Sequence, residues 1–407
     1  MDMTQKKSKN PPRRKAGSTK KAGGTAKKSV RVKRAGVAAK KNIRAKKTGV
    51  ARVFRILVIN PGSTSTKLSL FQNERERYSA TESHSAREIG QYPSILDQED
   101  FRLRQARAFL TQHRIDSKRL DAVVGRGGLL RPIESGVYRV NGLMLSDLRA
   151  ARFGEHASNL GALLAWRIAE EAGRPAFIVD PVVVDEMEET ARITGIPEIR
   201  RRSIFHALNQ KSAAREVARR LGKPYEKCNL IVAHLGGGIS VGAHRKGRVV
   251  DVNNALDGEG PFAPERAGSI PAGQLVEICF SGRFSLEEIK SRLTGRGGLV
   301  AYRGSSSLEE LKRADDGGDR QAKVLFAALA LRISQEICRH GATFEGKVDA
   351  VILTGGMARE SELVALVKNR VRHLGPVTVI PGEREMLALA EGALAVLRGK
   401  RRAREYR

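Results

Sequence analysis

Residues 60–67 read NPGSTSTK and directly follow the apolar run FRILVI at residues 54–59. A short run rich in β-branched residues is typical of a buried strand. Leu68, Leu70 and Phe71 come next in near alternation with polar residues and predict a second strand. The stretch therefore predicts a β-hairpin with a polar turn.

The polar turn has a composition that suits phosphate binding. Gly62 lets the backbone turn sharply, Ser63 and Ser65 offer hydroxyl and amide groups, and Lys67 adds a positive charge. A concave set of N–H and hydroxyl donors can hold phosphate oxygens. The turn is not the GxxxxGK[ST] loop, because no glycine directly precedes Lys67. Taken alone, an ordinary polar hairpin is the alternative interpretation.

A later stretch repeats this layout. Residues 230–233 (LIVA) lead into His234 and the sequence LGGGIS, and residues 241–252 predict two further strands around a turn. The three glycines of the loop are Gly236, Gly237 and Gly238. They leave no side chain between the backbone and a triphosphate. Two such hairpins predict a duplicated architecture in which facing loops hold one phosphate chain between two domains.

Strand-like and helix-like segments alternate along the rest of the chain. The expected helices cover residues 157–172, 209–221, 321–340, 361–373 and 385–397. Further strands cover residues 176–184, with an interruption at Asp180 and Pro181, and residues 349–353 and 377–380. This alternation predicts an α/β fold with mixed sheets. One strand ends at Gly355 and Gly356, where a base or ribose has access to bare backbone. A plain strand-to-helix turn is equally compatible with these two glycines.

Four ionisable side chains follow strands or stand in glycine-rich segments. They are Arg126, Asp180, His206 and Arg266. Arginine is suited to a bidentate grip on carboxylate or phosphate. Singly, however, each arginine is more often a surface residue, and a histidine is more often a core or capping residue.

The formal net charge of +30 is unevenly distributed. Residues 1–52 carry 19 Lys or Arg and one acidic residue, whereas the remainder has a net charge of +12. Because residues 1–52 lack hydrophobic periodicity, we expect a disordered basic tail. An electrostatic arm for nucleic acid, an organellar targeting peptide, and a solvated extension or misplaced start remain open. Without aromatic residues, the tail would bind nucleic acid only non-specifically.

Cysteine spacing and hydropathy bear on the cellular location. Cys228, Cys279 and Cys338 form neither a CxxC pair nor a zinc-ligand pattern, which argues against a disulfide framework and a zinc site. No window of 18 apolar residues predicts a transmembrane helix, and the start lacks a secretory signal. We therefore expect a cytoplasmic protein that does not insert into a membrane.

Long, separated stretches of residues 53–407 resemble the acetokinase family. They are INPGSTSTK, VGRGGLLRPIESGVY, GEHASNLGALLA, FIVDPVVVDEM, RRSIFHALNQK, HLGGGISVGAH, VDVNNALDGEGPFAPERAGSIP and LTGGMA. The resemblance implies the duplicated two-domain fold of acetate and sugar kinases and actin, with ATP in the inter-domain cleft and Mg²⁺ on its phosphates. It also implies domains at residues 53–182 and 183–383, a last helix at about 384–398 packed on the first domain, and a homo-oligomer.

The resemblance also implies site residues by position. It assigns Asn60, Ser63, Ser65 and Lys67 to a first phosphate hairpin, His234 with Gly236, Gly237 and Gly238 to a second phosphate loop, and Gly355 with Gly356 to an adenosine loop. Arg126 and Arg266 would flank the transferring group and the substrate carboxylate. His206 would stabilise the transition state, and Asp180 would lie near the metal and the reacting centre.

The metal side of the site is implied to include Asn60 and an acidic residue late in the chain. Family members have adjacent acidic residues after a proline, whereas this segment reads PGEREM, with Arg384 between Glu383 and Glu385. Glu385 is expected on the metal side, and Glu383 is the alternative.

The residues after Arg126 bear on the length of the acid. Acetate kinases resemble this chain around Arg126 but typically have bulkier apolar residues where Gly127 and Gly128 stand. The missing side chains predict room for a three- or four-carbon tail, and hence ATP-dependent phosphorylation of butyrate in preference to acetate. Because one methylene changes discrimination by only about 1–3 kcal/mol, isobutyrate, propionate and valerate stay open.

Two other kinds of protein are compatible with parts of the sequence. One is a nucleic-acid-binding protein that acts through the basic tail, and the other is a non-catalytic ATP-binding sensor with the same fold. The joint presence of Arg126, His206 and Arg266 favours the enzyme.

Overall fold

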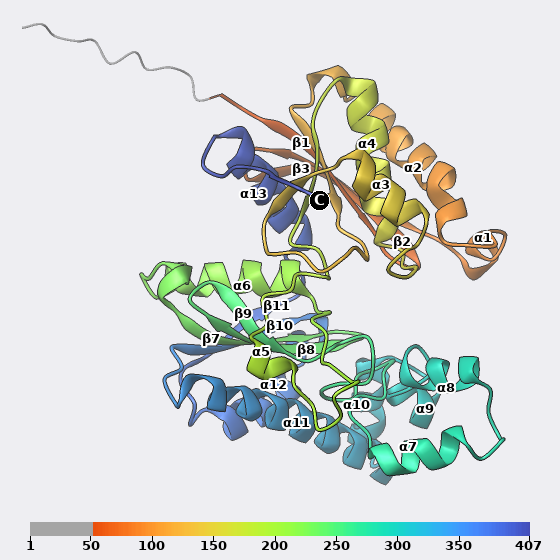
Figure 1. Cartoon of the computed structure of the whole chain (residues 1–407), viewed down its shortest axis with the longest axis vertical. Coiled ribbons are helices and arrows are strands. Elements are labelled where there is room, and N and C mark those ends of the chain that lie inside the picture. The colour runs from red at the N-terminus through yellow and green to blue at the C-terminus, as the bar shows by residue number, and fades with distance from the viewer. Residues whose placement is uncertain (1–51) are drawn as a thin grey trace, which may run out of the picture. The chain divides into compact units, whose positions relative to one another are not determined.

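The hairpin predicted around residues 60–67 forms two adjacent strands inside the first of two β-sheets (Figure 1). The computed structural model describes residues 52–407. The tail predicted at residues 1–52 therefore lies outside the described residues, apart from Arg52. We call each sheet, together with the helices that cover it, a lobe.

The first sheet has seven strands in the order β12–β5–β6–β4–β1–β2–β3. Its strands are β1 (Arg55–Pro61), β2 (Ser65–Gln72), β3 (Arg75–Ser83), β4 (Ala122–Arg126), β5 (Val137–Arg139), β6 (Ala176–Val179) and β12 (Arg404–Glu405). The central strand β1 is antiparallel to β2 and parallel to β4, and β4 is parallel to β6. The sheet is therefore mixed.

The second sheet has five strands in the order β11–β10–β7–β8–β9. Its strands are β7 (Asn229–Leu235), β8 (Ile239–Arg245), β9 (Arg248–Val252), β10 (Ala350–Gly355) and β11 (Val377–Pro381). Here β7 is antiparallel to β8 and parallel to β10, and β10 is parallel to β11. The order and directions repeat those of β3–β2–β1–β4–β6, so the duplication predicted from the two hairpins is present.

Helices cover both faces of each sheet, which explains why the central strands are apolar throughout rather than alternating. In the first lobe, Leu57 and Ile59 pack with α2 (Glu99–Gln112), α3 (Gly142–Arg149) and α4 (Asn159–Ala172). Ile56 and Val58 point to the other face and pack with α13 (Glu385–Leu397). The last long helix thus returns the chain to the first sheet.

The second sheet is covered in the same way. One face packs with α11 (Arg320–Gly341) and α12 (Ser361–Val371), and the other packs with α6 (Ala207–Arg220). The remaining helices are short: α1 (Ala86–Ile89), α5 (Glu189–Arg192), α7 (Ala272–Cys279), α8 (Leu286–Leu293), α9 (Leu299–Arg303) and α10 (Leu308–Asp316). Among the described helices, none has the length and apolarity needed to cross a membrane.

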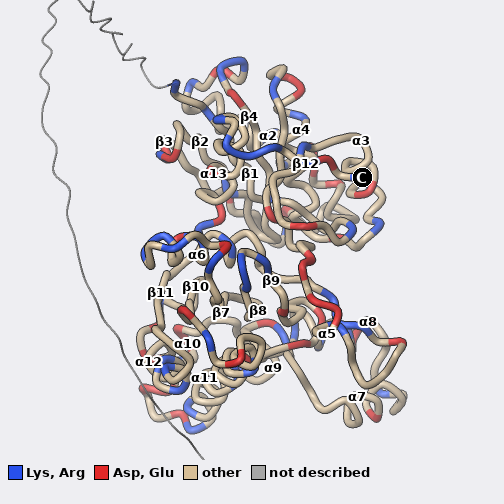
Figure 2. Tube along the Cα trace, turned by 60° about the vertical axis from the view of Figure 1, so that its left-hand side comes forward, with Lys and Arg blue, Asp and Glu red and all other residues tan. Residues whose placement is uncertain are grey.

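The strand expected at residues 176–184, with an interruption at Asp180 and Pro181, stops at that interruption and does not resume as a strand. It ends at Val179, because Asp180 adopts a left-handed conformation (φ 38°) and Pro181 follows. Proline cannot donate a ladder hydrogen bond, and a positive φ turns the chain out of the sheet. The helices α1, α2, α3, α5 and α7 to α10 were not predicted. Figure 2 shows Lys and Arg interspersed with Asp and Glu along both lobes.

Two glycines let α4 pack directly on the end of β4. A methyl group at Gly161 would overlap the backbone carbonyl oxygen of Arg126, and one at Gly125 would overlap the carbonyl of Gly161. Backbone cannot move aside as the end of a flexible side chain can. The position of Arg126 therefore depends on this close approach.

We predict that Gly161→Ala lowers the free energy of unfolding by about 1–3 kcal/mol, as overpacking of a tight core contact does. Gly142→Ala is the matched control, because no atom lies within 4 Å of a Cβ at this position at the start of α3. It should leave the unfolding free energy unchanged or raise it by up to about 1 kcal/mol. Urea unfolding followed by circular dichroism measures both, and equal midpoints would contradict the packing argument.

Candidate active site

A small pocket of about 60 Å³ brings together residues that are far apart in the sequence. Its polar lining comprises Arg126, His156, His206 and Arg266, and its apolar walls are Leu129, Val182, Ile204, Phe205, Ala255 and Leu256. Arg126 ends β4 of the first sheet, whereas His206 precedes α6 of the second lobe. The pocket thus joins the two lobes, and three of the four residues predicted at the reacting centre line it.

Beside this pocket, three side chains form a buried polar cluster. Asn60 Nδ2 donates to Glu385 Oε2 at 2.8 Å, and Arg126 Nη1 lies 3.2 Å from the same oxygen. Burial alone would raise the pKa of Glu385, but Arg126, Asn60 and His234 outweigh it and hold that pKa below its usual range. Glu385 is therefore an ionised carboxylate at the point where β1, β4 and α13 meet.

Arg102 of α2 binds the hairpin turn between β1 and β2 through hydrogen bonds. Its guanidinium, 0% exposed, donates to the carbonyl oxygens of Gly62 and Ser65 at 2.8 and 3.0 Å. These bonds occupy carbonyl acceptors of the turn and leave the hydroxyls of Ser63 and Ser65 for another partner. Burial lowers the pKa of Arg102 to about 10. Sequence analysis missed Arg102, because an arginine within an amphipathic helix resembles a surface residue.

Lys67 and Glu383 lie at the edge of this arrangement. Lys67 Nζ is 3.4 Å from Glu383 Oε2, and both side chains are about 40% exposed. Glu385, by contrast, is 4% exposed. Glu383 and Glu385 are the two candidates for the metal side that the sequence left open. They therefore differ in burial and in the side chain that each contacts.

Two histidine rings stack at the opening of the second lobe. The rings of His206 and His234 are 3.8 Å apart and inclined by 11°. His206 Nδ1 contacts Ser240 Oγ at 2.8 Å, and Asn209 Nδ2 contacts His234 Nδ1 at 2.8 Å. Burial lowers the pKa of both rings, that of His234 to about 4 and that of His206 well below its ordinary value. Both imidazoles are neutral at pH 7.

The glycines of the HLGGGIS loop make room for these side chains. A methyl at Gly238 would overlap the guanidinium of Arg266, and one at Gly236 would lie 2.9 Å from His234 Nε2. Arg266 donates to the carbonyl oxygen of Ala255, and burial lowers its pKa. A methyl at Gly237 would only reach the Glu265 carboxylate at 3.6 Å. The loop is thus in place beside Arg266 and the histidine pair.

The two glycines that end β10 differ from one another. Gly355 has φ 94°, and a side chain there would overlap the backbone of Leu235 at the end of β7. Gly356 has no atom within 4 Å of a Cβ position. Gly355 is therefore needed for the packing of neighbouring strand ends, while Gly356 leaves open space beside the backbone.

Asp180 lies close to this site, but its carboxylate is engaged elsewhere. Oδ1 accepts from Ser135 Oγ at 2.6 Å and from Gly136 N at 2.8 Å, and Oδ2 accepts from Arg215 at 3.0 Å. Burial alone would raise the pKa of Asp180, but Arg215 and Lys211 outweigh it and lower that pKa. Asp180 nevertheless lines a small cavity of about 10 Å³ together with Arg126, His206 and Glu385.

The space predicted beside Gly127 and Gly128 is filled. A methyl at Gly127 would lie 2.5 Å from Pro181 Cβ, and one at Gly128 would lie 2.5 Å from Asn159 Cα. The argument that these glycines make room for an acyl tail was therefore wrong. They allow neighbouring backbone to approach, and the apolar walls of the pocket come instead from residues such as Leu129 and Leu256.

His156 is a pocket residue that sequence analysis did not single out. Its Nδ1 contacts Ser158 Oγ at 2.8 Å, and burial together with Arg126 and Arg266 lowers its pKa to about 4. It stands in the segment GEHASNLG, which was noted only as part of the resemblance. A histidine before a helix start gives no signal that separates it from an ordinary capping residue.

The described residues contain no group of three or more His, Cys, Asp or Glu side chains that could hold a metal ion on its own. Mg²⁺ that is bound partly by substrate phosphates would use only one or two protein carboxylates. Glu385 and the amide oxygen of Asn60 are oxygen donors of that kind, and Glu385 is ionised. Cys228, Cys279 and Cys338 are free thiols.

Comparison with known proteins gives concordant results. The acetokinase family model matches residues 194–391. Butyrate kinase 2 of Clostridium acetobutylicum is 50% identical over 354 residues, which cover 87% of this chain and 99% of that protein.

Solved structures show the same architecture. Porphyromonas gingivalis acetate kinase superimposes with a TM-score of 0.69 at 18% identity, covering 84% of this chain and 100% of that one. A propionate kinase from Francisella tularensis gives a TM-score of 0.66 at 20% identity, covering 83% and 98%. They confirm the predicted two-domain acetate/sugar kinase and actin-like fold with mixed sheets. From its fold and from the extent of its identity to a butyrate kinase, the chain belongs to the acetokinase family.

Proposed function

We propose that this protein transfers the γ-phosphoryl group of ATP to butyrate and forms butanoyl phosphate and ADP reversibly. Membership of the acetokinase family makes the chain an ATP-dependent kinase of a carboxylic acid. The observation that carries the choice of acid is the pocket, which combines two arginines with six apolar side chains in a small volume. A short aliphatic carboxylate has this distribution of charge and apolar surface.

The chemical difficulty of this reaction is electrostatic. A carboxylic acid with a pKa of about 4–5 is already ionised at neutral pH and needs no general base. It must, however, approach a phosphate chain that is also negative. Catalysis therefore depends on positioning and on neutralising charge.

Arg126 and Arg266 supply positive charge from opposite sides of the pocket. Arg126 is held by Asn60 and Glu385, and Arg266 by the carbonyl of Ala255. We assign the substrate carboxylate and the transferring phosphoryl group to the space between them. His206 lines the same pocket and would donate a hydrogen bond to the phosphoryl oxygens.

ATP would lie along the two hairpins. We assign its phosphates to Ser63, Ser65 and Lys67 of the first turn and to the backbone of Gly236, Gly237 and Gly238 in the second. The adenosine would lie against Gly355 and Gly356. Asn60 and Glu385 would hold Mg²⁺, which when bound neutralises part of the phosphate charge.

Asp180 would support this site indirectly. Its carboxylate hydrogen-bonds to Ser135, Gly136 and Arg215, next to the end of β6. We therefore assign it a positioning role near the reacting centre. We further propose a homo-oligomer that acts in the cytoplasm, where ATP is available and thiols such as the three free ones here stay reduced.

The choice of acid predicts a specific order of rates. Acids of two to five carbons are supplied with ATP and Mg²⁺, and the acyl phosphate is trapped as its hydroxamate. We expect a higher kcat/KM for butyrate than for acetate, with propionate between them, because the apolar walls favour each methylene added from acetate to butyrate by about 1–3 kcal/mol. Isobutyrate and valerate should also be turned over, because a change of one carbon gives only modest discrimination. Faster turnover of acetate than of butyrate would overturn the assignment.

The alternative nucleic-acid function predicts a different dependence on the tail. A protein of residues 52–407 should form acyl phosphate at the rate of the full chain, because every assigned site residue lies within that range. If deletion of residues 1–51 abolishes activity, and a gel shift with DNA or RNA is lost with it, the tail carries the function instead.

The assignment of the metal side predicts a contrast between two neighbouring carboxylates. Glu385→Gln should raise the Mg²⁺ concentration needed for half-maximal rate roughly 10-fold or more, since a contact to a charged group contributes about 1.5–3 kcal/mol. Glu383→Gln is the matched control and should leave that concentration unchanged. The reverse pattern would move the metal side to Glu383.

A further inference from the structure

A chain of buried hydrogen bonds runs from His206 away from the pocket. It passes from His206 through Ser240 of β8, Gln210 of α6 and His244 of β8 to Tyr225. Its links measure 2.8, 2.7, 2.9 and 2.7 Å in that order. Sequence analysis gave no sign of it, because its members come from three separate segments.

The direction of each donor follows from one fixed point, the backbone carbonyl of Ser240. A carbonyl oxygen only accepts, and Gln210 approaches it at 3.0 Å, so the amide group facing Ser240 is the NH₂ of Gln210. Gln210 Oε1 therefore faces His244 Nε2 and accepts its proton. In a neutral His244 ring, Nδ1 then accepts from the Tyr225 hydroxyl.

The same reasoning fixes the hydroxyl of Ser240. Its oxygen accepts from Gln210 Nε2 and from the backbone N–H of His206. A hydroxyl has two acceptor sites and one proton, so both acceptor sites are used. The remaining contact is to His206 Nδ1, and the Ser240 proton is donated there.

We propose that this chain locks His206 as the neutral tautomer with its proton on Nε2, so that the ring always presents a donor to the pocket. Ser240, Gln210, His244 and Tyr225 are its positioning residues. The proposal rests on the function proposed above only for the identity of the group that accepts the hydrogen bond from Nε2. Among the described residues, no side chain or backbone group hydrogen-bonds to His206 Nε2, and His206 lines the pocket.

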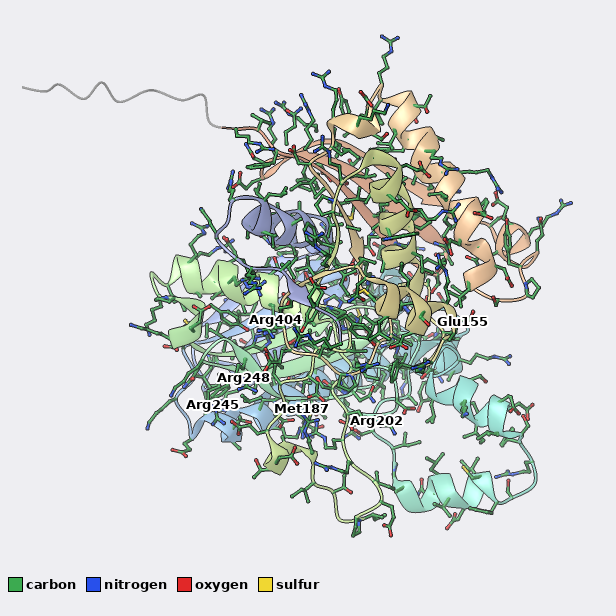
Figure 3. The ribbon with its side chains drawn as sticks, turned by 45° about the horizontal axis from the view of Figure 1, so that its top comes forward. Glu155, Met187, Arg202, Arg245, Arg248 and Arg404 are labelled. Atoms are coloured by element: carbon green, nitrogen blue, oxygen red, sulfur yellow. The ribbon has the colours of Figure 1, made fainter. Side chains whose placement is uncertain are left out.

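The packing around these hydrogen-bonded side chains agrees with a fixed arrangement. Gln210 and His244 are fully buried, whereas His206 is partly exposed. Burial lowers the pKa of both rings well below the ordinary value, so each is neutral. A methyl at Gly242 would lie 2.7 Å from Gln210 Oε1, so the glycine leaves room for the Gln210–His244 bond. The far end, Tyr225, borders a pocket whose lining includes Arg215, Arg401, Arg402 and Arg404. Of these residues, Arg404 is labelled in Figure 3.

A neutral Nε2–H donor suits a pocket already crowded with positive charge. Arg126 and Arg266 both disfavour a proton on His206, so an imidazolium there would be unstable. A tautomer with its proton on Nδ1 would present a lone pair to the phosphoryl oxygens and repel them. The imidazolium and the tautomer with its proton on Nδ1 are thus both disfavoured. His206 therefore needs no change of protonation or tautomer at each turnover, and the free energy of such a change is avoided.

Nitrogen NMR of ¹⁵N-histidine-labelled full-length protein tests the tautomer without any substrate. The protein has 8 histidines, and the His206 signals are identified as those that disappear in His206→Gln. We expect a pyrrole-type shift at Nε2 and a pyridine-type shift at Nδ1. A pyrrole-type shift at Nδ1, or two equal shifts of an imidazolium, overturns the proposal. This outcome is independent of which acid the enzyme phosphorylates.

Ser240→Ala removes the donor to Nδ1 and tests the consequence. We expect mixed tautomers at His206 and a kcat lowered about 10-fold, the effect of one lost hydrogen bond, with KM for ATP and for the acid unchanged. Ser334→Ala is the matched control, since this buried serine donates only to a carbonyl within α11. An unchanged kcat and tautomer in Ser240→Ala would contradict the role of the chain.

Discussion

The contact of Glu385 with Asn60 and Arg126 is the interaction on which the rest of the site depends. It joins the first residue of α13 to the ends of β1 and β4, over more than 250 residues of intervening chain in each case. It forms because α13 leaves the second lobe and packs its apolar face on the first sheet. The burial of Leu389 and its neighbours therefore fixes a carboxylate and an arginine at the opening between the lobes. Stability and function are linked at this point.

Charge is distributed around the pocket in a way that matches the reaction. The two arginines remain charged, whereas His156, His206 and His234 are held neutral by burial and by those same arginines. Three protonated rings would add repulsion beside the two arginines and cost stability. As neutral donors, they can bind developing negative charge without that cost. The site therefore combines fixed positive charge with oriented dipoles, which is the arrangement expected when two anions must meet.

The sequence predicted the duplicated α/β fold well, because the apolar strands and the glycine turns of both hairpins are local signals. It also identified Asn60, Arg126, His206 and Arg266, which the structure brings to one region. Arg102, His156 and the Ser240–Gln210–His244 chain were missed, since their roles depend on contacts between distant segments. The interpretation of Gly127 and Gly128 failed for the same reason. A missing side chain signals free space only when no other atoms fill it.

In the proposed reaction, the positive charge of Arg126 drives transfer between two anions. The most direct measurement is the rate of acyl phosphate formation by Arg126→Ala, with and without added guanidinium ion, beside Arg149→Ala on the exposed side of α3. The account predicts a loss of about 10²–10³-fold in kcat for Arg126→Ala, with partial recovery when guanidinium is added. Arg149→Ala should keep the full rate. Full activity of Arg126→Ala without guanidinium would contradict the account.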